Sequence, residues 1–234
     1  MARGTTPTDE SAPNGSRTRS NADSVFDSLR ADILGGIYEP GSRLKFASLS
    51  ERYGASVSVL REALARLAEQ RLVLSEPRVG FRVTDLSAPS LKDLTWTRIE
   101  IESLALRRAV ATGDISWEST VLAAHHKLDR TPMFSEDSPQ RIRDEWELAH
   151  GEFHRALVAG CGSEWLISIA ANLRDCAELY RRWSGAREPK RDVAAEHRRL
   201  LNAVIDRDGD AAAEALTFHY ESTARILLGD FAAG

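Results

Sequence analysis

The feature that most restricts the fold is a tight turn between two helical patterns. The first pattern covers about 47–53 and stops at Gly54, a residue that readily takes a positive φ angle. The second begins almost at once and covers about 56–70, with leucines spaced to form one apolar face. Two short alternating stretches, 72–75 and 80–83, follow with the spacing of paired strands. This order predicts a winged helix-turn-helix.

The segments around this motif set the boundaries of an N-terminal domain. An amphipathic pattern begins at Asn21 and stops at Gly35-Gly36, which predicts one more helix. Residues 38–44 contain Pro and Gly and are expected to form a turn. Residues 1–20 are small and polar, so we expect a disordered tail, with a basic arm near DNA as the competing interpretation. The domain is therefore expected over 21–85.

Residues 86–90 form a short linker pattern, and the remaining sequence is helical. Glycine, proline and aspartate breaks divide it into six helices, over about 90–112, 114–129, 139–160, 163–184, 191–208 and 210–228. Six such helices predict an antiparallel bundle over 91–230. The expected fold class is mainly α, with a winged helix-turn-helix before an all-helical bundle.

Composition excludes several classes of protein. The longest apolar runs are too short to span a bilayer, so no membrane partner is expected. The two cysteines, Cys161 and Cys176, have no CxxC spacing, which favours a reducing cytoplasm. The net charge of -4 gives no sign of a nucleic-acid partner. A DNA-binding hypothesis therefore depends on the motif alone.

Four histidines occupy positions that helical geometry can bring together. His150 and His154 lie at i and i+4 on one helix face. His197 and His219 lie about 18 and 15 Å from the turn at Gly209, so an antiparallel hairpin places them nearly level. Neutral imidazole suits a divalent ion of Zn, Ni, Cu or Fe. The alternative is that each histidine makes an ordinary hydrogen bond, which we retain for His125 and His126.

A metal-dependent hydrolase with an N-terminal interaction module is the competing function. The segment HGEFH resembles the HExxH of zinc proteases, but Gly151 stands where the general base is required. Glu152 lies about 200° round the helix from His150 and is expected to point away from a metal. The sequence therefore favours a protein that is not an enzyme.

The segments PGSRL, LSERYGAS, VLREALARL and GFRV resemble the GntR family of winged-helix regulators. The resemblance implies that the second helix reads operator DNA and that the wing contacts its backbone. Val57 stands where the family usually has an arginine that reads guanine, so an altered sequence preference is expected. The residues expected to contact DNA are Lys45, Ser56, Val57, Ser58, Val59, Arg61, Arg78 and Gly80.

The second half resembles the FCD effector domain of the FadR subgroup, through Arg98-x-x-x-Glu102, Phe153-His154-x-x-Leu157, Glu196-His197 and His219. The resemblance implies a divalent metal held by four side chains and completed by a small carboxylate effector. His150 stands where an aspartate is usual, which shifts the expected metal toward Zn or Ni. The expected metal ligands are His150, His154, His197 and His219.

The expected effector residues are Arg98, Glu102 and Arg174, with Arg98 as the first candidate for a carboxylate clamp. An i,i+4 ion pair between Arg98 and Glu102 is the alternative. Residues 121–132 resemble the carbon-starvation-induced branch, whose effectors are short dicarboxylates. We expect a homodimer on a pseudo-palindrome of double-stranded DNA. The resemblance implies a repressor that the acid releases from DNA as the commoner outcome, with activation as the alternative.

Overall fold

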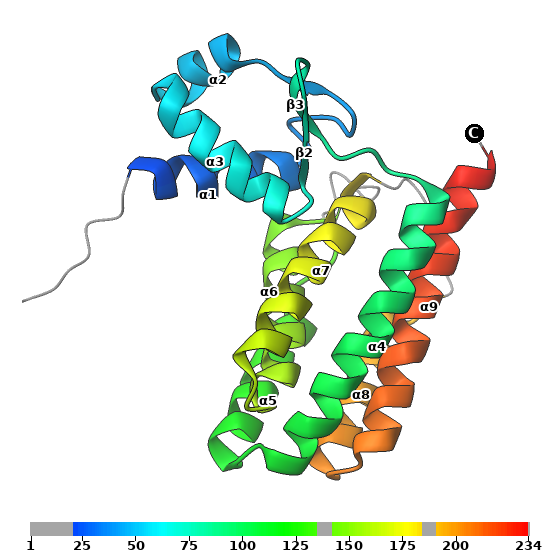
Figure 1. The fold of residues 1–234 in the computed structure, drawn as a ribbon. Helices are drawn as coiled ribbons and strands as arrows, with labels where there is room; N and C mark the ends of the chain where they lie inside the picture. The colour runs from blue at the N-terminus through cyan, green and yellow to red at the C-terminus, as the bar shows by residue number, and fades with distance from the viewer. Residues whose placement is uncertain (1–20, 135–141, 184–190, 234) are drawn as a thin grey trace, which may run out of the picture.

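The computed structural model describes residues 21–134, 142–183 and 191–233. A small N-terminal domain of helices and short strands packs on one end of a bundle of long helices (Figure 1). The mainly helical class is confirmed, as are the winged helix-turn-helix and the antiparallel bundle. The expected tail over 1–20 lies outside the described residues.

The N-terminal domain is built on one apolar core. Its helices and strands are α1 (Asn21–Leu34), β1 (Arg43–Leu44), α2 (Phe46–Tyr53), α3 (Val57–Glu69), β2 (Val73–Glu76) and β3 (Gly80–Val83). Gly54 ends α2 with φ 60° and donates its backbone N–H to the carbonyl of Ser50, as its conformational freedom predicts. The three leucines of the α3 stripe, Leu60, Leu64 and Leu67, are fully buried against α1 and the sheet.

The sheet has one more strand than the sequence predicts. The strand order is β1-β3-β2, and Leu44 in β1 lies opposite Phe81 in β3. The expected turn over 38–44 therefore ends in a strand. A strand of two residues is too short to show alternation, so its pairing depends on β3, which is distant in the sequence.

The six bundle helices within the described ranges are α4 (Ala88–Thr112), α5 (Ile115–Asp129), α6 (Asp144–Ala159), α7 (Glu164–Trp183), α8 (Val193–Ile205) and α9 (Gly209–Ala233). α4 packs on α7 and α9, α5 on α6, and α8 on α9. Phe153, Leu157 and Leu200 lie at the centre with almost no exposed surface. Among these helices, none combines the length and apolarity that a membrane crossing requires.

Two helix starts differ from the prediction. α6 begins at Asp144, because buried Ile142 forms an isolated β-bridge with Phe134 instead of joining the helix; the earlier part of the expected start, 139–141, lies outside the described residues. α4 begins at Ala88, inside the expected linker 86–90. Ser87 caps it by accepting a hydrogen bond from the backbone of Ser90 at 3.3 Å.

Helix α7 joins the two domains. Leu179 is buried in the core of the N-terminal domain, and Trp183 packs against the same core. Asp175 forms an ion pair with Arg30 of α1, and the Cys176 thiol donates to the carbonyl of Gln70 at 3.4 Å. The N-terminal domain is therefore docked on the last turns of a bundle helix.

Candidate functional site

The start of α3 is the exposed end of the helix-turn-helix. Ser56 caps the helix and accepts a hydrogen bond from the backbone N–H of Val59 at 3.5 Å, while its hydroxyl lies 2.9 Å from that of Ser58. Val57 is 48% exposed. The Arg61 guanidinium lies 5.2 Å from the centroid of the Phe46 ring and stays at the surface. These side chains are free to meet a large external partner.

The wing presents Arg78 and Gly80 in the conformations that a tight turn needs. Their φ angles are 65° and 101°, both in the region that favours glycine. Arg43 of β1 donates its Nε–H to the carbonyl of Val79 at 3.0 Å and ties the turn to the sheet. The sequence analysis did not predict a role for Arg43, because its strand β1 has only two residues and shows no alternation of polar and apolar side chains. Lys45 lies exposed at the start of α2.

Inside the bundle, three helices bring four histidines together. His150 and His154 come from α6, His197 from α8 and His219 from α9, and all four are buried. One ring nitrogen from each lies within 4.8 Å of the others. The ring centroids of His197 and His219 are 4.7 Å apart. The two histidines therefore lie at the same height in the hairpin of α8 and α9, as the spacing from Gly209 predicts.

The cluster contains ring nitrogens without a hydrogen-bond partner. They are His150 Nδ1, His154 Nε2 and His197 Nε2. Buried polar atoms are normally hydrogen-bonded, so three ring nitrogens without a hydrogen-bond partner in one place fit a cation, although the Glu147 carboxylate lies 3.9 Å from His150 Nδ1. Burial lowers the pKa of every histidine in the cluster, and neighbouring imidazoles or arginines lower it further, while the hydrogen bond with Glu196 opposes this shift at His219. Neutral imidazole is the form that binds metal.

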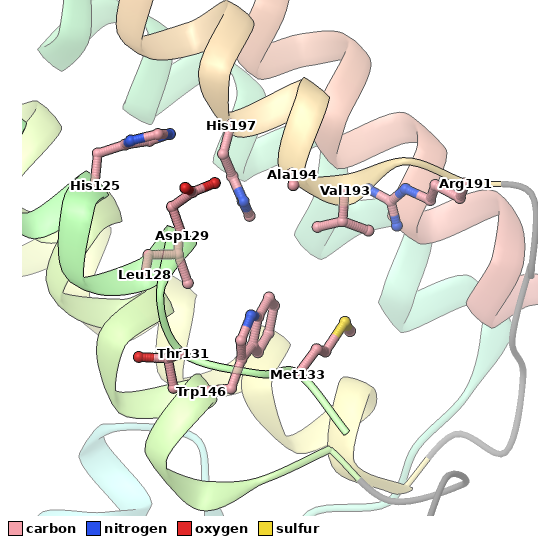
Figure 2. A pocket seen from close by; sticks show the side chains of 10 residues that line it. All are labelled: His125, Leu128, Asp129, Thr131, Met133, Trp146, Arg191, Val193, Ala194 and His197. Atoms are coloured by element: carbon pink, nitrogen blue, oxygen red, sulfur yellow. The ribbon is translucent and has the colours of Figure 1, made fainter. Parts of the chain in front are cut away.

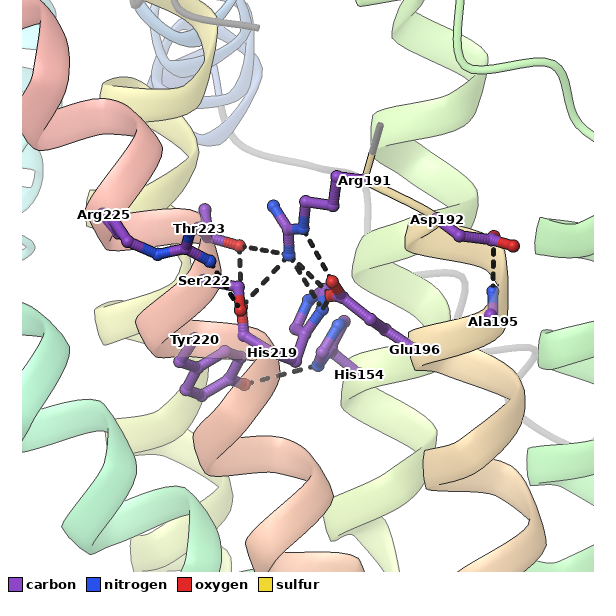
Figure 3. A network of polar contacts seen from close by, with 10 residues as sticks. All are labelled: His154, Arg191, Asp192, Ala195, Glu196, His219, Tyr220, Ser222, Thr223 and Arg225. Atoms are coloured by element: carbon purple, nitrogen blue, oxygen red, sulfur yellow. Dashed lines mark hydrogen bonds and ion pairs between the residues drawn. The ribbon is translucent and has the colours of Figure 1, made fainter. Parts of the chain in front are cut away.

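Polar side chains contact the Nδ1 atoms of two histidines in the cluster, His219 and His154 (Figure 3). His219 Nδ1 lies 2.7 Å from a carboxylate oxygen of Glu196, which also accepts two hydrogen bonds from Arg191. Burial raises the pKa of Glu196, but its hydrogen bonds with Arg191 and His219 lower that pKa to about 2. Tyr220 donates to Glu102 at 2.6 Å, and its hydroxyl lies 3.3 Å from His154 Nδ1. These contacts orient both rings.

Sequence reasoning missed Arg191 and Tyr220. Glu196 was noted for its position beside His197, but its carboxylate contacts His219 on the neighbouring helix. No local spacing signals a contact between helices that are distant in the sequence.

The expected effector residues fall into a paired set and an unpaired one. Arg98 donates to Glu102 at 2.8 Å, and its guanidinium lies 3.8 Å from the centroid of the Tyr220 ring. The structure thus contains the i,i+4 ion pair considered as the alternative. Arg174 is 5% exposed, and none of its three guanidinium nitrogens has a partner. Of the two arginines in the expected set, Arg174 is therefore the one without a hydrogen-bond partner.

The remaining histidines and Glu152 lie outside the cluster, as expected. His125 packs its ring edge near Phe153, and His126 is exposed. Glu152 forms an ion pair with Lys127 of α5 at 2.6 Å. The side chain that a hydrolase would need as a base thus points to the surface of the bundle.

A cavity of about 220 Å³ reaches the cluster from the side of α5 and α8. Figure 2 shows His197 pointing toward Trp146, with His125 and Asp129 of α5 on one side and Arg191 and Met133 on the other. The Trp146 ring stacks on His150 with centroids 4.6 Å apart. Among the cavities described here, this one has a cluster histidine in its wall.

Two family models match the chain. Residues 21–83 match the model described as bacterial regulatory proteins, gntR family, and residues 93–222 match the FCD domain. Similar solved structures support the fold alone: McbR/YncC of E. coli has a TM-score of 0.73 at 21% identity and covers 92% of this chain and 100% of its own. A putative GntR regulator from Rhodococcus sp. RHA1 has a TM-score of 0.72 at 23% identity, over 90% of this chain and 99% of its own.

Relatives at higher identity are also regulators. The chain is 36% identical to the uncharacterized HTH-type transcriptional regulator BphR of Paraburkholderia xenovorans, over 89% of this chain and 86% of the relative. It is 36% identical to the HTH-type transcriptional repressor GlaR of Escherichia coli, over 82% and 88% of the two chains. The hydrolase hypothesis is therefore wrong, since both halves match regulators. The chain belongs to the GntR family of DNA-binding transcription regulators and carries an FCD domain.

Proposed function

We propose that this regulator is a cytoplasmic, homodimeric repressor whose operator affinity is controlled by a small organic acid at a metal site in the bundle. The observation that carries the proposal is the cluster of four buried histidines with three orphaned ring nitrogens. Repression is supported by the relative GlaR, which is a repressor.

The histidines fit a divalent metal, because their donor atoms converge and are neutral. His150, His154, His197 and His219 would hold it, and the metal would supply a Lewis acid for carboxylate oxygen. An all-imidazole set favours Zn or Ni over a harder cation. Glu196 and Tyr220 support the set by fixing the rings of His219 and His154.

An anionic ligand is supported by the charge of the site. Four neutral imidazoles leave a divalent cation uncompensated, while Glu102 is already paired with Arg98. The unpaired Arg174 adds a further positive charge, and it lies close enough to lower the pKa of His154. A carboxylate would balance these charges, with Arg98, Glu102 and Arg174 as its proposed surroundings. The cavity beside His197 offers an approach.

The DNA-binding end would place one α3 helix of each protomer in the major groove. Ser56, Ser58 and Arg61 would contact phosphate or base edges, Val57 and Val59 would meet thymine methyl groups, and Lys45, Arg78 and Gly80 would contact the backbone. A two-fold dimer requires a pseudo-palindromic operator.

Dimer formation is supported by large apolar side chains on two helices that pack together. α4 exposes Trp96 and Leu104, at 64% and 50%, and α7 exposes Trp165 and Ile169, at 82% and 41%. Such exposure is typical of a surface that is covered in an assembly. Sedimentation analysis of Trp165→Glu, which is expected to shift the protein toward monomer, tests this surface.

The proposed function is tested by DNA binding in the presence of organic acids. Metal-loaded protein is expected to shift the intergenic DNA beside its own gene in a salt-dependent way. A small carboxylate should weaken that binding, and His154→Ala should abolish the response while leaving DNA binding. A protein that binds no such DNA, or that responds to acids equally without the histidine, would overturn the proposal.

A further inference from the structure

The arginines of the N-terminal domain differ in whether a carboxylate neutralises them. Four of them form ion pairs: Arg30 with Asp175, Arg52 with Asp32, Arg66 with Asp23, and Arg82 with Glu76 and Asp85. The arginines that form no ion pair with a described residue are Arg43, Arg61, Arg71 and Arg78. Because an unpaired cation on the surface keeps its full charge, these side chains are the ones available to an external polyanion.

Arg43 of β1 keeps its charge although its neighbour in the sheet does not. Its Nε–H donates to the carbonyl of Val79 at 3.0 Å, and a second N–H of the same guanidinium donates to the same oxygen. A guanidinium has five N–H donors, so three remain, and the side chain is exposed. Arg82, which lies opposite Arg43 in β3, is held by the carboxylates of Glu76 and Asp85. Of these two facing arginines, only Arg43 can bind a further anion.

Three other unpaired cations lie on either side of Arg43 and connect the wing to α3. Arg78 precedes the residue that Arg43 contacts at the tip of the wing. Lys45 follows Arg43 by two residues and is exposed, and Arg61 of α3 lies over the ring of the next residue, Phe46. The tip of the wing and the start of α3 both lie at the end of the domain away from the bundle (Figure 1). Arg78, Arg43, Lys45 and Arg61 therefore form a basic strip from the wing to α3.

We propose that Arg43 is a further DNA-contacting residue, which fixes the tip of the wing through Val79 and binds a backbone phosphate with its remaining N–H donors. The planar guanidinium suits phosphate oxygens, which it can bind in pairs. Two hydrogen bonds already hold the side chain, so little conformational freedom is lost when the phosphate binds. The inference rests on the proposed placement of α3 in the major groove and adds a residue to the contacts named there.

A phosphate contact has a consequence that a base contact lacks. Phosphates carry no sequence information, so Arg43 contributes the same free energy to the binding of every DNA sequence. Each neutralised phosphate also releases counterions, so the contribution falls as the salt concentration rises.

The test measures the salt dependence of DNA binding by the full-length protein. The probes are the intergenic DNA beside its own gene and a duplex of the same length with a shuffled sequence. We expect Arg43→Gln to reduce the slope of log K against log salt concentration by about 1, and to weaken binding of both duplexes about tenfold at about 0.1 M salt.

Arg71→Gln is the matched control for a change in net charge. Arg71 is also exposed and unpaired, but it follows Gln70, whose carbonyl accepts a hydrogen bond from Cys176 of the bundle. This variant loses the same charge at the junction with the bundle, away from the basic strip, so it should keep the wild-type slope. Both positions are exposed, so the unfolding temperatures should match that of the wild type.

Arg43→Lys separates contact with DNA from support of the wing. Lysine keeps the charge that a phosphate attracts but lacks the planar fork that holds the carbonyl of Val79. The slope should therefore return to the wild-type value. An unchanged slope in Arg43→Gln, or equal losses in the two Arg43 variants, would overturn the inference. A loss confined to the intergenic DNA would overturn it as well, since it would indicate a base contact.

The same measurements distinguish this inference from the proposed function. Wild-type protein that binds both duplexes without any response to organic acids would contradict the proposed control by a ligand, while the comparison of slopes would still decide the role of Arg43. Wild-type protein that binds neither duplex would overturn both.

Discussion

The two domains differ in where their polar side chains lie: at the surface in the N-terminal domain, and partly in the interior in the bundle. In the N-terminal domain the buried side chains are aliphatic or aromatic, and the serines and arginines at the start of α3 and in the wing lie at the surface. The bundle buries four histidines of the cluster together with charged groups. These buried charged side chains are Arg98, Glu102, Glu147, Arg174 and Arg181.

This difference follows from the size of what each domain binds. DNA is larger than the domain, so the groups that contact it must lie outside and the core can be wholly apolar. A small ligand can enter the protein, where the low dielectric strengthens each contact but makes every unpaired group costly. The stability of the bundle should therefore depend on bound ligands, while that of the N-terminal domain should not.

Metal removal is expected to have the largest effect. At a metal concentration a thousand times its Kd, the metal should stabilise the bundle by about 4 kcal/mol, because it binds the folded cluster and not the unfolded chain. Thermal unfolding with and without a chelator, together with metal analysis, measures this effect. His197→Ala should lose both the metal and the shift, whereas His126→Ala changes an exposed histidine and should keep both. Equal metal content in the two variants would contradict the proposed ligand set.

Two glutamates on α6 give a matched comparison of buried and exposed charge. The Glu147 side chain is 1% exposed and accepts two hydrogen bonds from Arg181, while Glu152 pairs with Lys127 at the surface. Glu147→Gln should destabilise the protein by about 3 kcal/mol, because it leaves a buried guanidinium without its counter-charge. Glu152→Gln should cost less than about 1 kcal/mol. Urea unfolding measures both, and similar values would show that burial of charge does not set the stability of the bundle.

A change at Val57 addresses the DNA-binding surface. Val57→Arg introduces the side chain that the family usually has, at an exposed position where no repacking is needed. We expect an unchanged unfolding temperature and about tenfold stronger discrimination for operators with guanine at the contacted position, since one bidentate contact contributes about 1–3 kcal/mol. Fluorescence anisotropy with guanine and adenine variants of the operator measures this. The same change in affinity for every sequence would indicate a phosphate contact instead.

The features that sequence reasoning predicted depend on local spacing. The leucine stripe of α3, the turn at Gly54 and the level of His197 with His219 all follow from the geometry of one helix or one hairpin. The helices themselves could be predicted for the same reason, because each has its own repeat of apolar residues.

The features it missed depend on contacts between distant segments. β1 exists because β3 pairs with it, and the start of α6 depends on a bridge between Ile142 and Phe134. Arg98 is hydrogen-bonded to Glu102, whereas the Arg174 guanidinium has no hydrogen-bond partner, and no spacing rule shows which of the two arginines is left unpaired.

The smallest expected effect separates folding from DNA contact within the N-terminal domain. Both serines are exposed, but only Ser56 accepts a hydrogen bond from the backbone of α3, while Ser58 lies inside the first turn with its hydroxyl 2.9 Å from that of Ser56. Ser56→Ala should cost about 1 kcal/mol of stability, because the backbone N–H of Val59 loses its acceptor. Ser58→Ala should leave the unfolding temperature unchanged, and both variants should weaken DNA binding. If Ser58→Ala destabilised the domain as much as Ser56→Ala, the surface serines would contribute to folding as the buried polar groups of the bundle do, and the contrast between the domains would fail.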